Sequence, residues 1–277
     1  MPDVAGVLTS AAGGVRLVSD DTGAGEAVVL LHGWPDTARL WRGVVPGLVD
    51  AGYRVLVPDL RGCGRSDRPA GVEDYAMGRL VDDVLGVLDA ARVEAAHVVG
   101  HDWGAALAWA VALRHPERVR SLGALAVGHP TAFRAAGLDQ MLRSLYVLAF
   151  RTEGLGEAFV AMEDYALLRR MGHPDAAEVA AGLAAGQLTP HLNWYRANLP
   201  ADAFVTPPPR LAPLAVRALG VWASGDRGLG EAQMLDSARY CARGFCYVRL
   251  EGLGHWFVLE APDKVTKVLR DFLADEG

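Results

Sequence analysis

The strongest chemical signal in this 277-residue chain is the segment Gly100-His101-Asp102-Trp103-Gly104. It follows a short apolar run typical of a buried strand, at 96–99, and precedes a helical pattern over 103–114. Two glycines around a central residue, between a strand and a helix, form the elbow that presents one nucleophile above a sheet. Here the nucleophile would be the Asp102 carboxylate, which can attack a saturated electrophilic carbon and form an alkyl ester. An ordinary helix N-cap is the alternative for this aspartate.

Two further residues could complete a hydrolytic site. His255, in the segment after the last apolar run, would be the general base, because a neutral imidazole can take a proton from water. Asp226, which follows the preceding apolar run, would orient that imidazole and stabilise its cation. The order Asp102, Asp226, His255 is the order of nucleophile, acid and base that accompanies this type of elbow.

Two backbone N–H groups could stabilise negative charge on the reacting carboxyl group. In the motif His32-Gly33-Trp34-Pro35 the donor would be Trp34, because Pro35 has no N–H. Together with the N–H of Trp103, it would form an oxyanion hole. The charge to be stabilised arises when water attacks the ester on Asp102. A plain β-turn is the alternative for this motif.

The elements that must position these residues alternate between short apolar runs and longer helical patterns. This alternation predicts an α/β fold with a mostly parallel sheet flanked by helices. The predicted strands are 27–31, 54–58, 96–99, 122–127, 216–222 and 246–250, and the predicted helices of this part are 37–50, 77–91, 103–114 and 261–274.

The alternation stops between the fourth and fifth predicted strands. Residues 129–210 have the pattern of several helices, and a segment of this length is too long for one crossover connection. We therefore expect a helical cap at 129–210, inserted into a core made of 1–128 and 211–277. Ligands of parallel sheets bind beyond the carboxyl ends of the strands, so the cap would cover the site.

Composition excludes several classes of function. The formal charge is −6, from 27 basic and 33 acidic residues, so no basic surface for nucleic acid or for an anionic membrane is expected. No apolar run is long enough to span a membrane, and the first residues lack the pattern of a secretory signal. Three cysteines without a paired spacing are typical of reduced thiols. We expect a cytoplasmic protein.

No cofactor or metal is implied. His97 and His101 straddle a predicted strand end and do not share a helix face, so they do not predict a metal site. Lys264 and Lys267 are the only lysines and lie in the C-terminal helix, so neither belongs to a phosphate-binding loop. The scarcity of lysine and the absence of isoleucine indicate a GC-rich, bacterial genome.

These motifs together resemble a known family. Over its whole length the chain is similar to the α/β-hydrolase fold, and specifically to its soluble epoxide hydrolase branch. The matching segments are His32-Gly33-Trp34-Pro35, Gly62-Cys63-Gly64-Arg65-Ser66, His101-Asp102-Trp103-Gly104 and Gly254-His255-Trp256.

The resemblance implies two cap tyrosines whose hydroxyls bind and protonate the epoxide oxygen. Tyr195, within Asn193-Trp194-Tyr195-Arg196, matches one motif position closely. Tyr146 matches the other through the nearby Phe150, and Tyr165 is its rival. A phenol suits this task because its pKa near 10 keeps it protonated at neutral pH.

The resemblance thus implies an epoxide hydrolase that converts an epoxide and water to a vicinal diol. A haloalkane or haloacetate dehalogenase shares the aspartate nucleophile, but Trp34 in place of an asparagine and the two tyrosines favour the epoxide. An ester or lactone hydrolase is disfavoured because the elbow has no serine. A non-catalytic small-molecule binding protein on the same fold is the alternative from a different class.

The expected partner is a hydrophobic epoxide in an aromatic-lined pocket. The oligomeric state stays open, with a homodimer as one alternative. Besides the catalytic residues, we expect the substrate to contact His32, Pro35, Phe150, Trp194 and Trp256.

Overall fold

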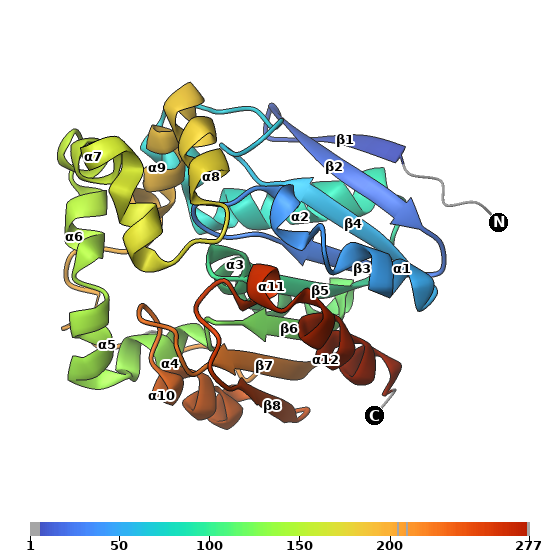
Figure 1. Ribbon diagram of the computed structural model, residues 1–277. Coiled ribbons are helices and arrows are strands. Elements are labelled where there is room, and N and C mark those ends of the chain that lie inside the picture. Colours follow the sequence, from blue (N-terminus) through green and yellow to red (C-terminus); the bar gives the residue numbers. More distant parts are fainter. Residues whose placement is uncertain (1–5, 204, 209, 276–277) are drawn as a thin grey trace.

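The computed structural model describes residues 6–203, 205–208 and 210–275. Its centre is an eight-stranded sheet in the order β1-β2-β4-β3-β5-β6-β7-β8 (Figure 1). Strands β3 to β8 pair in parallel, whereas β1 and β2 are antiparallel to their neighbours. The strands are β1 Gly6–Ala12, β2 Val15–Gly23, β3 Glu26–Leu31, β4 Tyr53–Asp59, β5 Ala96–His101, β6 Val119–Leu125, β7 Arg217–Ala223 and β8 Phe245–Leu250. The predicted mostly parallel α/β sheet is confirmed.

The hairpin of β1 and β2 is not predicted by the apolar runs. Along β1 partly buried and exposed residues alternate, and in β2 the exposed Arg16 lies between buried Val15 and Leu17. An antiparallel edge strand has one face in solvent, so it lacks the continuous apolar run of a central parallel strand. Residues 1–5, on which the expectation of no secretory signal depends, lie outside the described residues.

Helices cover both faces of the sheet. Long helices α2 (Met77–Ala90) and α3 (Trp103–Arg114) pack on one face, and α1 (Val45–Asp50) and α12 (Pro262–Ala274) pack on the other. Successive residues of β3 alternate between the two buried layers, as the pleat requires. None of the helices in the described ranges is long and apolar enough to cross a membrane.

One predicted helix is divided in two. We expect a single helix over 37–50, but the structure has a 3-10 turn at Ala38–Trp41 and then α1 at Val45–Asp50. Pro46 lies at the start of α1. A proline ring lacks an N–H and clashes with the preceding turn, so a helix cannot continue through it.

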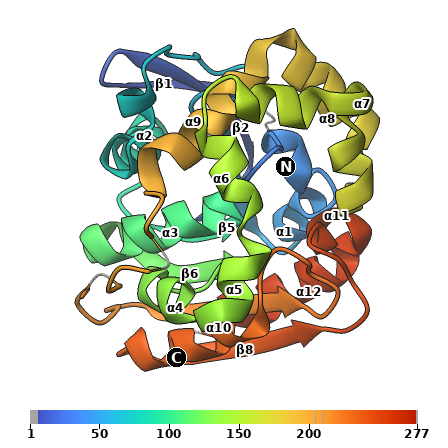
Figure 2. The same cartoon turned by 90° about the vertical axis from the view of Figure 1, so that its left-hand side faces the viewer.

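In the described residues between β6 and β7, where the cap was predicted, the structure has six α-helices. They are α4 Pro130–Ala135, α5 Gly137–Arg143, α6 Tyr146–Arg151, α7 Leu155–Met171, α8 Ala176–Gly182 and α9 Leu188–Asn198. Helices α6, α7 and α9 pack on one another, and α6 crosses the view in front of the sheet in Figure 2. Helix α4 instead packs against α10 (Glu231–Leu235) of the core. The boundaries 129–210 stay a prediction.

The remaining helices are short. They are the 3-10 segments Val72–Tyr75, Pro116–Arg118 and Asp236–Tyr240, the π-helical segment Leu183–Gln187, and helix α11 at Phe257–Glu260.

A buried ion pair fixes the segment that follows β4. Arg61 donates two hydrogen bonds of 2.7 Å to the carboxylate of Asp83 on α2, and both side chains are at most 2% exposed. The Arg61 carbonyl oxygen accepts a hydrogen bond from the Trp194 indole on α9, at 3.1 Å. The same residue therefore joins the core helix α2 to the helices above the sheet.

We expect Asp83→Ala to lower the free energy of unfolding by about 3–5 kcal/mol, because it leaves the Arg61 guanidinium buried without its partner. Urea-induced unfolding followed by circular dichroism measures this. The matched control is Asp271→Ala, which removes the exposed ion pair between Asp271 and Lys267 and should cost less than about 1 kcal/mol. Equal losses in the two variants would contradict the assignment.

Candidate active site

Three side chains predicted to act together meet at one edge of the sheet, because the carboxyl ends of its parallel strands lie there. His255 Nδ1 lies 2.7 Å from Asp226 Oδ2, and His255 Nε2 lies 3.7 Å from Asp102 Oδ2. The other oxygen of Asp226 accepts the N–H groups of Gly228 and Leu229 at 2.8 and 2.9 Å. Asp226 is thus fully hydrogen-bonded and holds the imidazole in one orientation.

Asp102 occupies a strained turn between β5 and α3. Its backbone has φ 54° and ψ −122°, a conformation that non-glycine residues rarely adopt. The turn is possible only with glycine on both sides. A Cβ on Gly100 would lie 2.0 Å from the carbonyl oxygen of Gly104, and one on Gly104 would lie 2.1 Å from that of Leu31.

The Asp102 carboxylate is bound by the N–H groups of the predicted oxyanion hole. The Trp34 N–H donates to Asp102 Oδ1 at 2.8 Å, and the Trp103 N–H also hydrogen-bonds to this carboxylate. Gly33 allows the approach, since a Cβ there would lie 2.5 Å from Asp102 Oδ1. Oδ1 therefore lies against the Trp34 N–H, and Oδ2 faces His255.

Burial and charge shift the pKa values of these groups in opposite directions. Burial raises the pKa of Asp102, against the attraction of His255 and the two N–H groups. Burial alone would lower the pKa of His255, but Asp226 and Asp102 outweigh it and raise this pKa to about 9. Burial would also raise the pKa of Asp226, yet the contact with His255 leaves it below its ordinary value.

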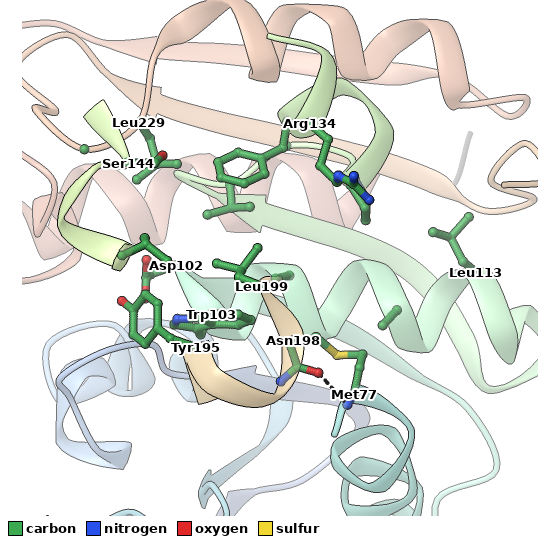
Figure 3. Close-up of a pocket in the computed structure, with 18 of the residues that line it drawn as sticks. Met77, Asp102, Trp103, Leu113, Arg134, Ser144, Tyr195, Asn198, Leu199 and Leu229 are labelled. Atoms are coloured by element: carbon green, nitrogen blue, oxygen red, sulfur yellow. Dashed lines mark hydrogen bonds between the residues drawn. The ribbon is translucent and has the colours of Figure 1, made fainter. Parts of the chain in front are cut away.

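Both expected tyrosines lie above Asp102. The rings of Tyr146 on α6 and Tyr195 on α9 have centroids 6.3 Å apart, and their hydroxyls interact with each other. Burial and the Asp102 charge raise the pKa of both phenols, which keeps them protonated. Figure 3 shows the Tyr195 ring beside Trp103, on the Asp102 side of the cavity. Tyr165 lines neither of the cavities next to Asp102.

Two cavities meet at Asp102, Tyr146 and Tyr195. The first, here called the apolar channel, has a volume of about 440 Å³ and is lined mainly by hydrophobic side chains of α3, α4, α6 and α9 (Figure 3). The second, here called the polar cavity, has a volume of about 480 Å³ and contains His255 and the arginines Arg169, Arg170 and Arg227.

Four of the five additional residues expected to contact the substrate lie outside both cavities. His32 is buried beneath the site, where its Nε2 accepts the Leu60 N–H, and Pro35 faces a separate surface pocket. Phe150 is fully buried behind Trp34 and Tyr195, and the Trp194 ring packs against Trp103. Trp256, the fifth, lines the polar cavity. A residue next to a motif lies near the site, but its position in the sequence does not determine whether its side chain points into a cavity or into the core.

Asp36, which none of the sequence motifs singles out, forms a buried network beside His255. Asp36 Oδ2 accepts the Trp256 indole N–H at 3.0 Å, and Oδ1 lies 3.3 Å from His173 Nε2. His173 Nδ1 accepts a backbone N–H, so its proton is on Nε2 and donates to Asp36. His191 Nε2 contacts the Asp36 carbonyl oxygen at 3.2 Å. The sequence signal that could have identified Asp36 is its place as an acidic residue directly after the motif His32-Gly33-Trp34-Pro35.

His101 is a second residue that the sequence analysis does not assign to the site. Its Nε2 donates to the carbonyl oxygen of His255 at 2.9 Å. Burial and the neighbouring His255 lower the pKa of His101 to about 3, so it stays neutral. Its position next to Asp102 was the only signal in the sequence.

The chain is similar to known proteins over nearly its whole length. A family model described as the alpha/beta hydrolase fold matches residues 26–262. The chain is 33% identical to epoxide hydrolase A of Mycobacterium tuberculosis, with 94% of each protein covered. It is 32% identical to the AB hydrolase superfamily protein YfhM of Bacillus subtilis, with 91% of each covered.

The fold agrees with these similarities. The crystal structure of epoxide hydrolase A from Mycobacterium thermoresistibile matches with a TM-score of 0.81 at 28% identity, covering 98% of this chain and 99% of that one. The chain therefore belongs to the α/β-hydrolase family, in the branch that includes the epoxide hydrolases.

Proposed function

We propose that the protein hydrolyses a hydrophobic epoxide to a vicinal diol through an alkyl ester on Asp102. The relatives from M. tuberculosis and M. thermoresistibile are epoxide hydrolases that align with almost all of this chain. The observation that carries the mechanism is the arrangement of Asp102. Its carboxylate lies at the meeting point of two cavities, below two buried phenols and beside a histidine paired with Asp226.

In the first step, Tyr146 and Tyr195 hold the epoxide oxygen while Asp102 Oδ2 attacks a ring carbon. Oδ2 is the attacking atom because Oδ1 is already bound by the Trp34 N–H. The carbon–oxygen bond of the ring breaks, and a tyrosine hydroxyl supplies the proton that neutralises the alkoxide.

In the second step, His255 takes a proton from a water molecule that attacks the ester carbonyl carbon. Asp226 stabilises the resulting imidazolium. Negative charge then develops on Oδ1, where the N–H groups of Trp34 and Trp103 are already in place, and each such donor contributes roughly 3 kcal/mol. The ester bond breaks, and the oxygen that leaves Asp102 takes the proton from His255 as the diol departs. The second proton of the attacking water, now on the Asp102 carboxyl group, returns to the tyrosine that protonated the alkoxide, which regenerates the carboxylate and both phenols.

We also propose that residues 129–210 act as the cap over this site. Both tyrosines come from this segment, on α6 and α9. The contacts of Asp36 with His173 and His191, and of Arg61 with Trp194, support a fixed position of the cap on the core.

His255→Gln should stop the reaction at the ester, because the variant has no base to activate water. Incubation with an epoxide and intact-protein mass spectrometry should show a gain of the full epoxide mass, since ring opening releases no leaving group. Peptide mapping should place the adduct on Asp102. The double variant Asp102→Ala/His255→Gln is the control and should stay unmodified. A gain only from haloalkanes, equal to the haloalkane mass minus hydrogen halide, would instead identify a dehalogenase.

Tyr195→Phe and Tyr146→Phe should each slow ester formation by roughly a hundredfold, because the alkoxide loses a proton donor. Single-turnover tryptophan fluorescence separates this step from ester hydrolysis, which should change far less. Tyr165→Phe is the matched control, since that ring lines neither cavity, and it should react at the wild-type rate. A large loss in Tyr165→Phe with little change in Tyr146→Phe would reverse the assignment of the first cap tyrosine.

Ester hydrolysis should become faster with rising pH, because only neutral His255 can accept a proton. In the free enzyme Asp226, Asp102 and Asp36 raise the His255 pKa to about 9. Esterification removes the Asp102 charge, so the midpoint for hydrolysis should lie below the pKa of His255 in the free enzyme. Stopped-flow decay of the ester across pH gives the first value, and NMR titration of the imidazole gives the second. Equal values would show that the Asp102 charge does not act on His255.

A further inference from the structure

The apolar channel follows one face of helix α3. Trp103, Ala106, Ala110 and Leu113 line it, at the spacing of successive helical turns. In Figure 3 this helix runs from Asp102 and Trp103 on one side of the cavity to Leu113 on the other. The channel therefore begins at the reacting carboxylate and extends along the helix axis.

Helix geometry gives the length of the channel. At a rise of 1.5 Å per residue, the twelve steps from Asp102 to Arg114 span about 18 Å. The opposite wall contributes the apolar side chains of Met77 at the start of α2, Phe133 on α4 and Leu199 after α9. Ser144, Arg134 and Asn198 are polar residues of the same wall. Arg114, the last residue of α3, lines the far end of the channel.

Two alanines set the width of this channel on the α3 side. Ala106 is partly buried and Ala110 is 9% exposed, and both face the cavity. The intervening Leu107 and Ala108 are fully buried against the sheet. A larger side chain at 106 or 110 would project into the channel, about 6 or about 12 Å from Asp102 along the helix.

The polar cavity has a different character. Its wall contains the charged side chains of three arginines and Glu260 beside His255, together with apolar side chains such as Met171 and Trp256. A long apolar group in this cavity would remove water from these charged side chains, which costs free energy. The two sides of the reacting carbon are therefore unequal, with an apolar channel on one side and a polar space next to the base on the other.

We propose, building on the epoxide hydrolase function above, that the substrate is an asymmetric epoxide with one long unbranched apolar substituent. This substituent lies in the channel along α3, and the small side chains of Ala106 and Ala110 leave the channel open for it. The other side of the ring is short and faces the polar cavity.

The test measures kcat/KM for terminal epoxides of increasing chain length, namely epoxybutane, epoxyoctane and epoxydodecane. With the wild-type enzyme, kcat/KM should rise along the series, as more apolar surface is buried. Ala106→Leu should lose roughly tenfold or more with epoxyoctane and epoxydodecane, and Ala110→Leu should lose this much only with epoxydodecane. Both variants should hydrolyse epoxybutane at close to the wild-type value, which also shows that they fold.

Ala135→Leu is the matched control, because Ala135 lies on α4 next to the channel wall but is exposed to solvent. Its kcat/KM for the three epoxides should equal that of the wild-type enzyme. If the wild-type kcat/KM does not rise with chain length, or if both leucine variants lose all three substrates equally, the proposed substrate class is wrong while epoxide hydrolysis stands. If no epoxide reacts with the wild-type enzyme, the proposed function itself fails. The wild-type series is informative even if a leucine variant does not fold.

Discussion

The backbone turn at Asp102 determines where almost every other part of the site must lie. Its φ of 54° costs of order 1–3 kcal/mol, and the structure retains it by close packing between Gly100 and Gly104. The Asp102 N–H donates to the Leu125 carbonyl oxygen of β6 at 3.1 Å, so this backbone donor stays paired with the neighbouring strand at the turn. The turn directs the carboxylate above the sheet and starts α3 directly beneath the cavity. The position of the Asp102 carboxylate and that of the channel wall are thus consequences of one local conformation.

The same constraint explains why the neighbouring loops contain buried polar groups. A carboxylate raised above the sheet needs its base and its N–H donors at fixed positions, although both come from loops. Asp36 links two of these loops, because it follows the Trp34 donor and accepts the indole N–H of Trp256, the residue after His255. Its contact with His173 extends the same network to the segment between α7 and α8. Burial of so many polar atoms is tolerated because most of them are hydrogen-bonded.

Sequence reasoning located the groups whose positions follow from local rules. Asp102, Asp226 and His255 each come after an apolar run, and the carboxyl ends of parallel strands share one edge, so their meeting could be predicted. Phe150 could not be placed, because whether it faces the cavity or the core depends on how α6 packs against distant helices. The channel was missed for the same reason. An alanine such as Ala106 does not indicate from the sequence whether it faces the core or a cavity. The cavity next to it exists only because α4 and α9, which are distant in the sequence, form the opposite wall.

The unequal cavities give the two proposed steps separate routes to one carboxylate. In the first step the organic substituent lies in the apolar channel while Oδ2 attacks, and in the second step water must reach the ester carbonyl carbon beside His255. Since His255 lines only the polar cavity of the two, water can approach from that side while the substituent remains in the channel. Oδ1 stays bound by the Trp34 N–H, so neither step requires the carboxyl group to rotate. A site of this form keeps the ester in a fixed orientation and still admits the second reactant.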